Sequence, residues 1–251
     1  MLPKERRKWI ENQLADQGKI DIEQLSQQLN VSTMTIRRDL NILEKEGKIF
    51  RTHGGAIHPK SLIQETPYST KKDKNVEQKK VIALKAIEII PKNSNIILDS
   101  GTTTFELAKL IKDRADLTVI TNDIKIAAEL VESKLKVIVT GGELQNEVGT
   151  LYGWPTQDLL RRIHADIFFL GAHAVDVSSG ITAPTFEKSL IKKLMMQAAE
   201  STWLLCDSSK FNQKSFSFVC HLSELEGIIT DQRLLETDRC QYSEHVKLIV
   251  G

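Results

Sequence analysis

The stretch STMTIRRDLN, residues 32–41, places two adjacent arginines in a segment that otherwise has the pattern of a short amphipathic helix. At about 100° per residue, Leu40 and Leu43 fall within roughly 40° of Ile36, so the three predict one buried ridge. The opposite face carries Met34, Thr35, Arg37 and Arg38. The stretch therefore predicts a helix that holds an arginine-rich face away from a core.

The flanking sequence predicts that this helix is the third of a compact unit. Apolar residues at helical spacing indicate two earlier helices, one ending near Gly18 and one at Asn30, which tolerates the left-handed cap conformation. These apolar residues are Trp9, Ile10 and Leu14, then Ile22, Leu25 and Leu29. Ser32 is a favourable N-cap for the third helix. Gly47 follows it, and KIFRTHGGAI, residues 48–57, has the alternation and paired glycines of a two-stranded hairpin.

Three helices and a hairpin in this order are typical of a winged helix-turn-helix, whose third helix enters the DNA major groove. Arginine suits bidentate contact with guanine, and hydroxyl groups suit phosphates or base edges. The predicted DNA-contacting residues are Ser32, Thr33, Met34, Thr35, Arg37 and Arg38, with Arg51 and His53 on the wing. Residues 1–60 contain 11 Lys and Arg against 8 Asp and Glu, a mild basic bias. The alternative is a small helical domain with a solvated charged face.

The remainder of the chain predicts a second domain after a polar connection. Residues 58–80 contain two prolines and several lysines and have no core pattern until their end. Seven short apolar runs then alternate mostly with helical stretches: 95–99, 117–121, 136–140, 166–170, 203–206, 227–230 and 247–250. Nearly continuous apolar strands separated by helices indicate a parallel sheet covered on both faces. The predicted boundaries are 3–58 for the first domain, 59–75 for a linker and 76–251 for the second domain.

The segment NIILDSGTTTFELAKLI, residues 95–111, predicts a strand, a turn of small residues and an amphipathic helix. Backbone N–H groups at such a helix N-terminus can bind an anion, and the hydroxyls of Thr102, Thr103 and Thr104 add donors. The local alternative is that these residues only cap the helix. Two other runs also end in small polar residues, at 121–122 and 140–142, and strand carboxyl ends converge on the ligand crevice of an open α/β sheet.

Several classes of site find little support in the sequence. There is no GxGxxG or P-loop motif, so nucleotide binding is not indicated, and we expect no cofactor. Cys206, Cys220 and Cys240 form no CxxC pair and the histidines show no HExxH spacing, so we expect reduced thiols and no metal site. The first ten residues have no apolar stretch after their charges and no run approaches a membrane span. We therefore expect a cytoplasmic protein with no signal peptide and no membrane partner.

With these motifs in place, the sequence closely resembles the DeoR family of bacterial transcription regulators. The matching positions are Arg6, Ile10, Leu14, Ser32, Thr35, Ile36, Arg37, Arg38, Asp39 and Leu40, together with HGGA at 53–56. The resemblance covers nearly the whole chain. It implies an α/β fold: an N-terminal winged helix-turn-helix and a C-terminal Rossmann-like α/β sensor domain similar to ribose-5-phosphate isomerase.

The resemblance also implies an effector site, because family members typically respond to phosphorylated sugars. Its motifs here are DSGTT at 99–103, TN at 121–122, GG at 141–142 and DSSKF at 207–211. On this basis the phosphate is held by Ser100, Gly101, Thr102, Thr103 and Thr104. Asp99 takes sugar hydroxyls, Lys210 supplies the counter-charge, and Asn122, Gly141 and Gly142 complete the site. Lys210 could instead be an ordinary solvated lysine.

Three positions depart from the family pattern: His173, Lys188 and Asn212. Many members carry a glutamate where Lys188 stands, and glycine is common where Asn212 stands. Lys188 adds positive charge that would suit a more anionic ligand, although it could equally be a surface substitution.

The expected function is a DNA-binding transcription regulator, a repressor of carbohydrate-metabolism genes as is most common in the family, modulated by a phosphorylated sugar. The expected partners are double-stranded operator DNA and further copies of the chain, because one module with so little charge should bind DNA weakly. One alternative is a phosphosugar isomerase or transferase with a DNA-binding-like appendage, but no general acid–base pair, and hence no catalytic residue, can be assigned. The other is a C-terminal domain that only oligomerises.

Overall fold

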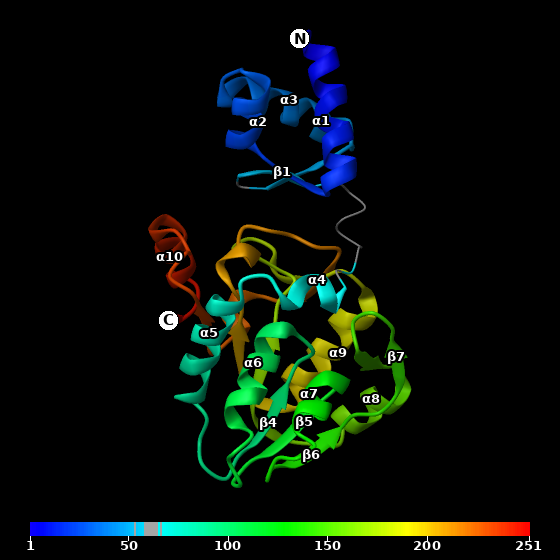
Figure 1. The fold of residues 1–251 in the computed structure, drawn as a ribbon, viewed down its shortest axis with the longest axis vertical. Coiled ribbons are helices and arrows are strands. Elements are labelled where there is room, and N and C mark those ends of the chain that lie inside the picture. Colours follow the sequence, from blue (N-terminus) through cyan, green and yellow to red (C-terminus); the bar gives the residue numbers. More distant parts are fainter. Residues whose placement is uncertain (53, 58–64, 66) are drawn as a thin grey trace.

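The structure is a computed structural model that describes residues 1–52, 54–57, 65 and 67–251. Figure 1 shows a small N-terminal unit of helices and short strands and a larger unit built around a sheet. Each has its own core. One apolar cluster lies in the first unit, and two lie in the second. No helix in these described ranges is long and apolar enough to cross a membrane.

The N-terminal unit has the three predicted helices, α1 (Pro3–Gln17), α2 (Ile22–Leu29) and α3 (Thr33–Lys45). The predicted signals act as expected: Gly18 and Asn30 take left-handed C-cap conformations, and the Ser32 side chain accepts from the backbone N–H of Thr35. Ile36, Leu40 and Leu43 are buried with at most 1% exposure. The predicted ridge is therefore confirmed.

The wing contains one strand more than the sequence predicted. The hairpin strands β2 (Phe50–Thr52) and β3 (Gly55–Ile57) pair antiparallel, and β1 (Lys19–Asp21) pairs with β3 to give the order β1-β3-β2. A Cβ on Gly55 would lie 1.9 Å from the carbonyl oxygen of Ile20. The close approach of β1 therefore requires glycine at that position.

A buried ion pair joins the first and third helices. The Arg6 guanidinium Nε lies 2.5 Å from Asp39 Oδ2, and both side chains are less than 10% exposed. Arg7 adds a longer contact of 3.4 Å to the other carboxylate oxygen. The acidic residue of the RRD run is thus turned into the core, while the two arginines before it face solvent.

The larger unit contains the predicted parallel sheet. All seven expected strands are present: β4 (Asn95–Leu98), β5 (Thr118–Thr121), β6 (Lys136–Val139), β9 (Ala165–Gly171), β12 (Ala199–Leu205), β14 (Gly227–Thr230) and β15 (Leu248–Val250). They lie in the order β15-β14-β12-β9-β4-β5-β6, and every neighbouring pair is parallel. From β4 the chain adds β5 and β6 on one side, and from β9 it adds β12, β14 and β15 on the other side. The topological switch point therefore lies between β4 and β9, and open α/β sheets bind ligands at such a point.

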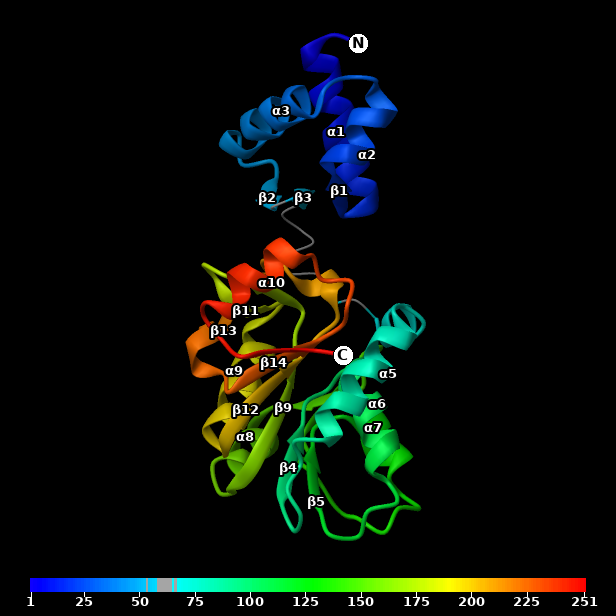
Figure 2. The same ribbon diagram turned by 90° about the vertical axis from the view of Figure 1, so that its left-hand side faces the viewer.

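Helices cover both faces of this sheet, as Figure 2 shows. One apolar cluster packs α5 (Val76–Ile87), α6 (Thr102–Ile111) and α7 (Ile124–Glu129) against one face. The other packs α8 (Trp154–Leu160), α9 (Phe186–Gln197) and α10 (Glu236–Ser243) against the opposite face. Burial on both sides explains why the strands read as continuous apolar runs.

Short antiparallel pieces surround the carboxyl edge of the sheet and were not predicted. They are the hairpin β7 (Glu143–Gln145) and β8 (Thr150–Tyr152), and the three-stranded sheet of β10 (Ala174–Asp176), β11 (Gly180–Ala183) and β13 (Ser217–Cys220). The 3₁₀ turns are η2 (Ser208–Lys210) and η3 (Leu222–Glu224). The predicted linker contains α4 (Tyr68–Lys72), and its expected start lies outside the described residues.

Candidate DNA-binding surface and effector cleft

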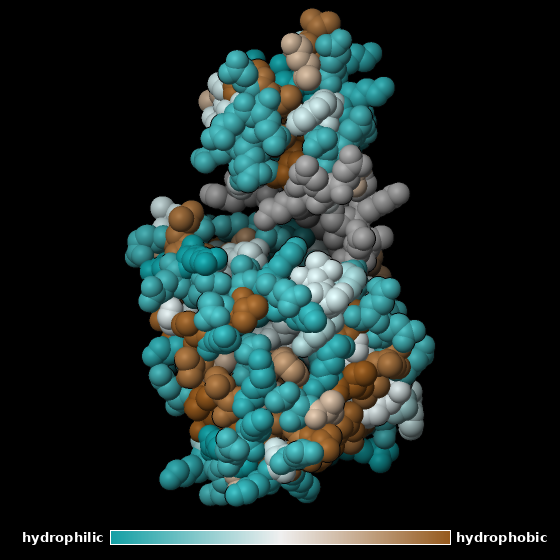
Figure 3. Space-filling view, in the orientation of Figure 1, coloured by the Kyte–Doolittle hydropathy of each residue, from teal (hydrophilic) through white to brown (hydrophobic). Residues whose placement is uncertain are grey.

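The open face of α3 carries the residues predicted to contact DNA. Ser32, Thr33, Met34, Arg37 and Arg38 are exposed and Thr35 is partly exposed. The Ser32 and Thr35 hydroxyls lie 2.9 Å apart, so they also bond to each other. Figure 3 shows that hydrophilic side chains cover most of the visible surface of this unit.

The two arginines on this face have no carboxylate partner within the part of the chain that the structure describes. Neither Arg37 nor Arg38 forms an ion pair with any residue that the structure describes, because the adjacent Asp39 is engaged with Arg6 inside the unit. Both guanidinium groups are exposed. Their charge is therefore available to a polyanion such as DNA.

Arg51 occupies a different position from the one expected of a free wing contact. Its Nη1 donates to the backbone carbonyl of Arg37 over 3.2 Å and to the side-chain oxygen of Asn41. In this conformation Arg51 fastens strand β2 to α3. His53, the other predicted wing contact, lies outside the described residues.

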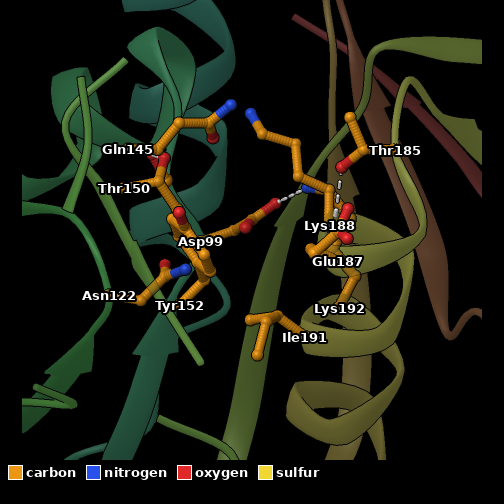
Figure 4. Close-up of a pocket in the computed structure, with 11 residues that line it drawn as sticks. Asp99, Asn122, Gln145, Thr150, Tyr152, Thr185, Glu187, Lys188, Ile191 and Lys192 are labelled. Atoms are coloured by element: carbon orange, nitrogen blue, oxygen red, sulfur yellow. Dashed lines mark hydrogen bonds and ion pairs between the residues drawn. The ribbon is translucent and has the colours of Figure 1, made fainter. Parts of the chain in front are cut away.

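The second site is a cleft at the carboxyl ends of β4, β5, β9 and β12. It comprises a cavity of about 200 Å³ and a larger one of about 700 Å³, which share Ser100, Lys188 and Lys192. Eight of the ten predicted effector residues line one or both: Asp99, Ser100, Gly101, Thr102, Thr103, Thr104, Asn122 and Lys210. Figure 4 shows Asp99, Asn122 and Thr150 on one side of the smaller cavity, facing Lys188 and Lys192 of α9.

The N-terminus of α6 opens into the larger cavity. Gly101 is its N-cap and no side chain caps the helix, unlike α3, α7 and α9, whose caps are Ser32, Asp123 and Thr185. Thr102 and Thr103 line the cavity, whereas the fully buried Thr104 donates its hydroxyl to the backbone carbonyls of Asp99 or Gly101. The first turn of α6 thus presents donors, and Thr104 shapes the turn.

Ser100 and Asp99 are held by neighbours that the sequence did not reveal. The Ser100 hydroxyl donates to Asp123 over 2.7 Å and lies 2.6 Å from the Thr150 hydroxyl. Asp99 accepts the backbone N–H of Gly171 at 2.8 Å and forms an ion pair with Lys192. Asp99 is therefore neutralised by Lys192, which lowers its capacity to accept further hydrogen bonds.

Asn122 presents an unused acceptor at the smaller cavity. Its amide nitrogen donates to the carbonyl of Leu151 over 3.2 Å, and its buried side-chain oxygen has no partner among the described groups. A buried acceptor without a partner is costly, so this oxygen is an unusual feature beside the cavity.

Gly141 and Gly142 line neither cavity. Both have positive φ, and a Cβ on Gly142 would lie 2.1 Å from the carbonyl oxygen of Tyr152. Their backbone lets the β7–β8 hairpin fold back over the end of β6. A direct ligand contact of these two glycines stays a prediction.

Lysines dominate the larger cavity. Among the residues described, seven lysines and two carboxylates line it: Lys71, Lys74, Lys79, Lys188, Lys192, Lys210 and Lys214 against Glu65 and Asp207. Lys79 is committed to backbone carbonyls of Lys71 and Lys74. Lys210 forms no ion pair with any group of the described ranges, lies in η2 and lines the same cavity as the α6 N-terminus. The cleft is therefore strongly cationic.

The three departures from the family pattern also lie at or beside this cleft. Burial lowers the pKa of His173 to about 4, so it is neutral at pH 7. Lys188 pairs with Glu65 at 2.8 Å, and burial lowers the pKa of Lys188 to about 8. Asn212 has φ of +56°, where asparagine substitutes for glycine at small cost, and its N–H donates to the Tyr242 hydroxyl.

A winged helix-turn-helix with an open arginine face, joined to an α/β domain with a cationic cleft, defines a DNA-binding regulator with a ligand-sensing domain. Family comparison agrees: residues 6–62 match the DeoR-like helix-turn-helix domain and residues 74–232 match the DeoR C-terminal sensor domain. The chain belongs to the DeoR family of transcriptional regulators, as its sequence predicted.

Several relatives that align with most of this chain are named as transcriptional regulators. The chain is 37% identical to the HTH-type transcriptional regulator GlpR of Haloferax volcanii over 93% of this chain and 92% of that protein. It is 35% identical to a putative aga operon transcriptional repressor of Escherichia coli O157:H7, covering 91% and 86%. It is also 35% identical to the L-fucose operon activator of Haemophilus influenzae, covering 87% and 88%. The chain is thus a transcriptional regulator of this family.

Solved structures resemble only part of the fold. A D-ribose-5-phosphate isomerase in complex with phospho-erythronic acid aligns with a TM-score of 0.41 at 18% identity, covering 54% of each chain. The eIF2B delta subunit of Chaetomium thermophilum aligns with a TM-score of 0.46 at 17% identity, covering 62% of this chain and 56% of that one.

Proposed function

We propose that this regulator binds operator DNA through the open face of α3 and that a phosphorylated sugar in the C-terminal cleft modulates this binding. Ser32, Thr33, Met34, Thr35, Arg37 and Arg38 would contact the major groove, and Arg51 and His53 the adjacent backbone. The unpaired arginines support this assignment, since guanidinium groups already engaged with carboxylates would have to give up those bonds.

The observation that carries the effector proposal is the pairing of an uncapped helix N-terminus with an excess of lysines in one cavity. The phosphate would lie against Thr102 and Thr103, whose first-turn N–H groups donate to anions, and Lys210 would neutralise it. Asn122 would accept a sugar hydroxyl. Ser100, Gly101 and Thr104 would hold the turn in shape around the ligand.

Repression of carbohydrate-metabolism genes is the proposed role. Two relatives are named for sugar operons, one as a repressor and one as an activator, which supports the carbohydrate context. We further propose a homo-oligomer that reads paired half-sites, because the N-terminal unit of this chain is only mildly basic. Effector binding would then change the spacing of two units.

The test is binding of phosphorylated sugars to the full chain by thermal shift and calorimetry. A ligand at about 100 times its dissociation constant should raise the unfolding free energy by about 2.7 kcal/mol. Lys210→Gln and Thr102→Val should abolish this shift while leaving operator binding intact. Lys112→Gln, which removes an exposed lysine at the far end of α6, is the matched control. Absence of a shift with every pentose and hexose phosphate would contradict the proposal.

A further inference from the structure

Glu65 places a carboxylate from the connecting segment inside the effector cleft. Its Oε2 lies 2.8 Å from the Lys188 ammonium, and its Oε1 lies 3.2 Å from that of Lys71. The Glu65 and Lys188 side chains are each only 14% exposed, and all three residues line the larger cavity. Glu65 follows the end of wing strand β3, Ile57, by eight residues.

This carboxylate is held as an anion by the cleft. Burial raises the pKa of Glu65, but Lys188 and Lys71 outweigh burial and keep the pKa below its ordinary value. Burial in turn disfavours the charged form of Lys188, and Glu65 partly restores it. Each buried charge therefore depends on the other, and a vacated Lys188 would require another anion.

We propose that Lys188 and Lys71 form a second anion subsite, which Glu65 fills until the effector's own second anionic group replaces it. This inference rests on the proposed function. The phosphate occupies the subsite at Thr102, Thr103 and Lys210, and the second group occupies Lys188 and Lys71. The chemical class is a sugar phosphate with another anion, namely a phosphorylated sugar acid or a sugar bisphosphate.

The arrangement of the cleft favours a ligand that spans both subsites. His173 lines the larger cavity together with Lys210 of the first subsite and with Lys71 and Lys188 of the second, and all three charges act on its imidazole. As a neutral imidazole it can bond the ligand's hydroxyl groups without adding charge. Exchange of Glu65 for the ligand would break the contacts of Glu65 with Lys188 and Lys71, so occupation of the cleft changes what holds Glu65 in place.

The experiment compares ligands that differ by one anionic group. The probes are glucose 6-phosphate with 6-phosphogluconate, ribose 5-phosphate with 5-phosphoribonate, and fructose 6-phosphate with fructose 1,6-bisphosphate, each titrated calorimetrically into the full chain. We expect the member with two anionic groups to bind more tightly in at least one pair. Glu65→Gln removes the competing carboxylate, so it should tighten that ligand by about 5–150-fold, the range of typical couplings, and leave the ligand with one anionic group nearly unchanged.

Two further variants keep the test decisive. Lys188→Gln should remove the preference for the second anion, and the double variant Glu65→Gln/Lys188→Gln, which removes both charges of the most buried pair, should do the same. If probes with one anionic group bind as tightly as their partners with two, and Glu65→Gln changes neither dissociation constant, the second subsite is refuted while the phosphate site stands. If no probe binds at all, the proposed function fails and this inference with it.

Discussion

The replacement Arg38→Gln isolates the role of the arginine face. Arg38 is exposed and forms no ion pair with a described residue, and it projects from the side of α3 opposite the ridge of Ile36, Leu40 and Leu43. Surface changes of this kind alter stability by less than about 0.5 kcal/mol. The folded state should therefore survive, with unchanged circular dichroism and melting temperature.

Operator affinity should fall sharply in the same variant. One bidentate arginine–guanine contact provides about 1–3 kcal/mol of discrimination, which corresponds to about 5–150-fold per half-site. A dimer on two half-sites doubles the free energy, to about 2–6 kcal/mol, so the loss lies between about 30-fold and 10⁴-fold. Arg38→Lys should recover only part of it, because lysine keeps the charge but not the planar pair of donors.

Fluorescence anisotropy with an operator fragment selected in vitro measures this loss. Specific and non-specific DNA are both titrated over a range of salt concentrations. Loss of a phosphate contact would weaken binding to both DNAs in parallel, whereas loss of a base contact weakens binding to the operator alone. Lys8→Gln is the matched control, since it removes one positive charge from an exposed position of α1 in the same unit. If Arg38→Gln binds the operator as well as Lys8→Gln does, the assignment of the face is wrong.

Three further predictions concern the scaffold and the cleft. Asp39→Asn should lower the unfolding free energy of the N-terminal unit by about 3–5 kcal/mol, because it leaves the buried Arg6 charge without its partner; chemical denaturation measures this, and a loss below about 1 kcal/mol would contradict it. Gly142→Ala should destabilise the C-terminal domain by about 1–3 kcal/mol through its clash with Tyr152 and its φ of +110°, seen as a lower melting temperature. The wild-type protein should lose stability as the pH falls from about 6.5 to about 4, because His173 of the unfolded chain binds a proton in this range and folded His173 does not. The unfolding free energy should fall by at most about 1.4 kcal/mol per pH unit from this source. The charged groups that face His173 are Lys210, Glu65, Lys71 and Lys188. His173→Asn should remove this part of the slope, and an unchanged slope would exclude His173 as its source.

The sequence predicted the features that rest on periodicity and caps. The ridge of α3, the left-handed residues Gly18 and Asn30 and the seven sheet strands each carry a local signal that tertiary packing reinforces. The missed strands, such as β1 and β11, are only three or four residues long. They form because a distant partner provides hydrogen bonds, and so short a segment has no period of its own to detect.

Only some residues of the candidate site were predictable from the sequence. Residues that follow sheet strands, such as Ser100 and Asn122, were predictable because parallel strands bring their carboxyl ends together. Glu65 and Lys192 were missed, since their positions depend on which side chains meet across the cleft. Gly142 carried a recognisable motif, and the structure adds a packing reason for glycine there, the nearby Tyr152 backbone.

Linkage between the two sites tests the central claim most directly. The measurement is the affinity of the full chain for operator DNA with and without a saturating phosphorylated sugar, and the affinity for that sugar with and without DNA. Each ligand should change the other's dissociation constant by the same factor, about 5–150-fold. Tight binding of the sugar in the cleft with no change in operator affinity would contradict it.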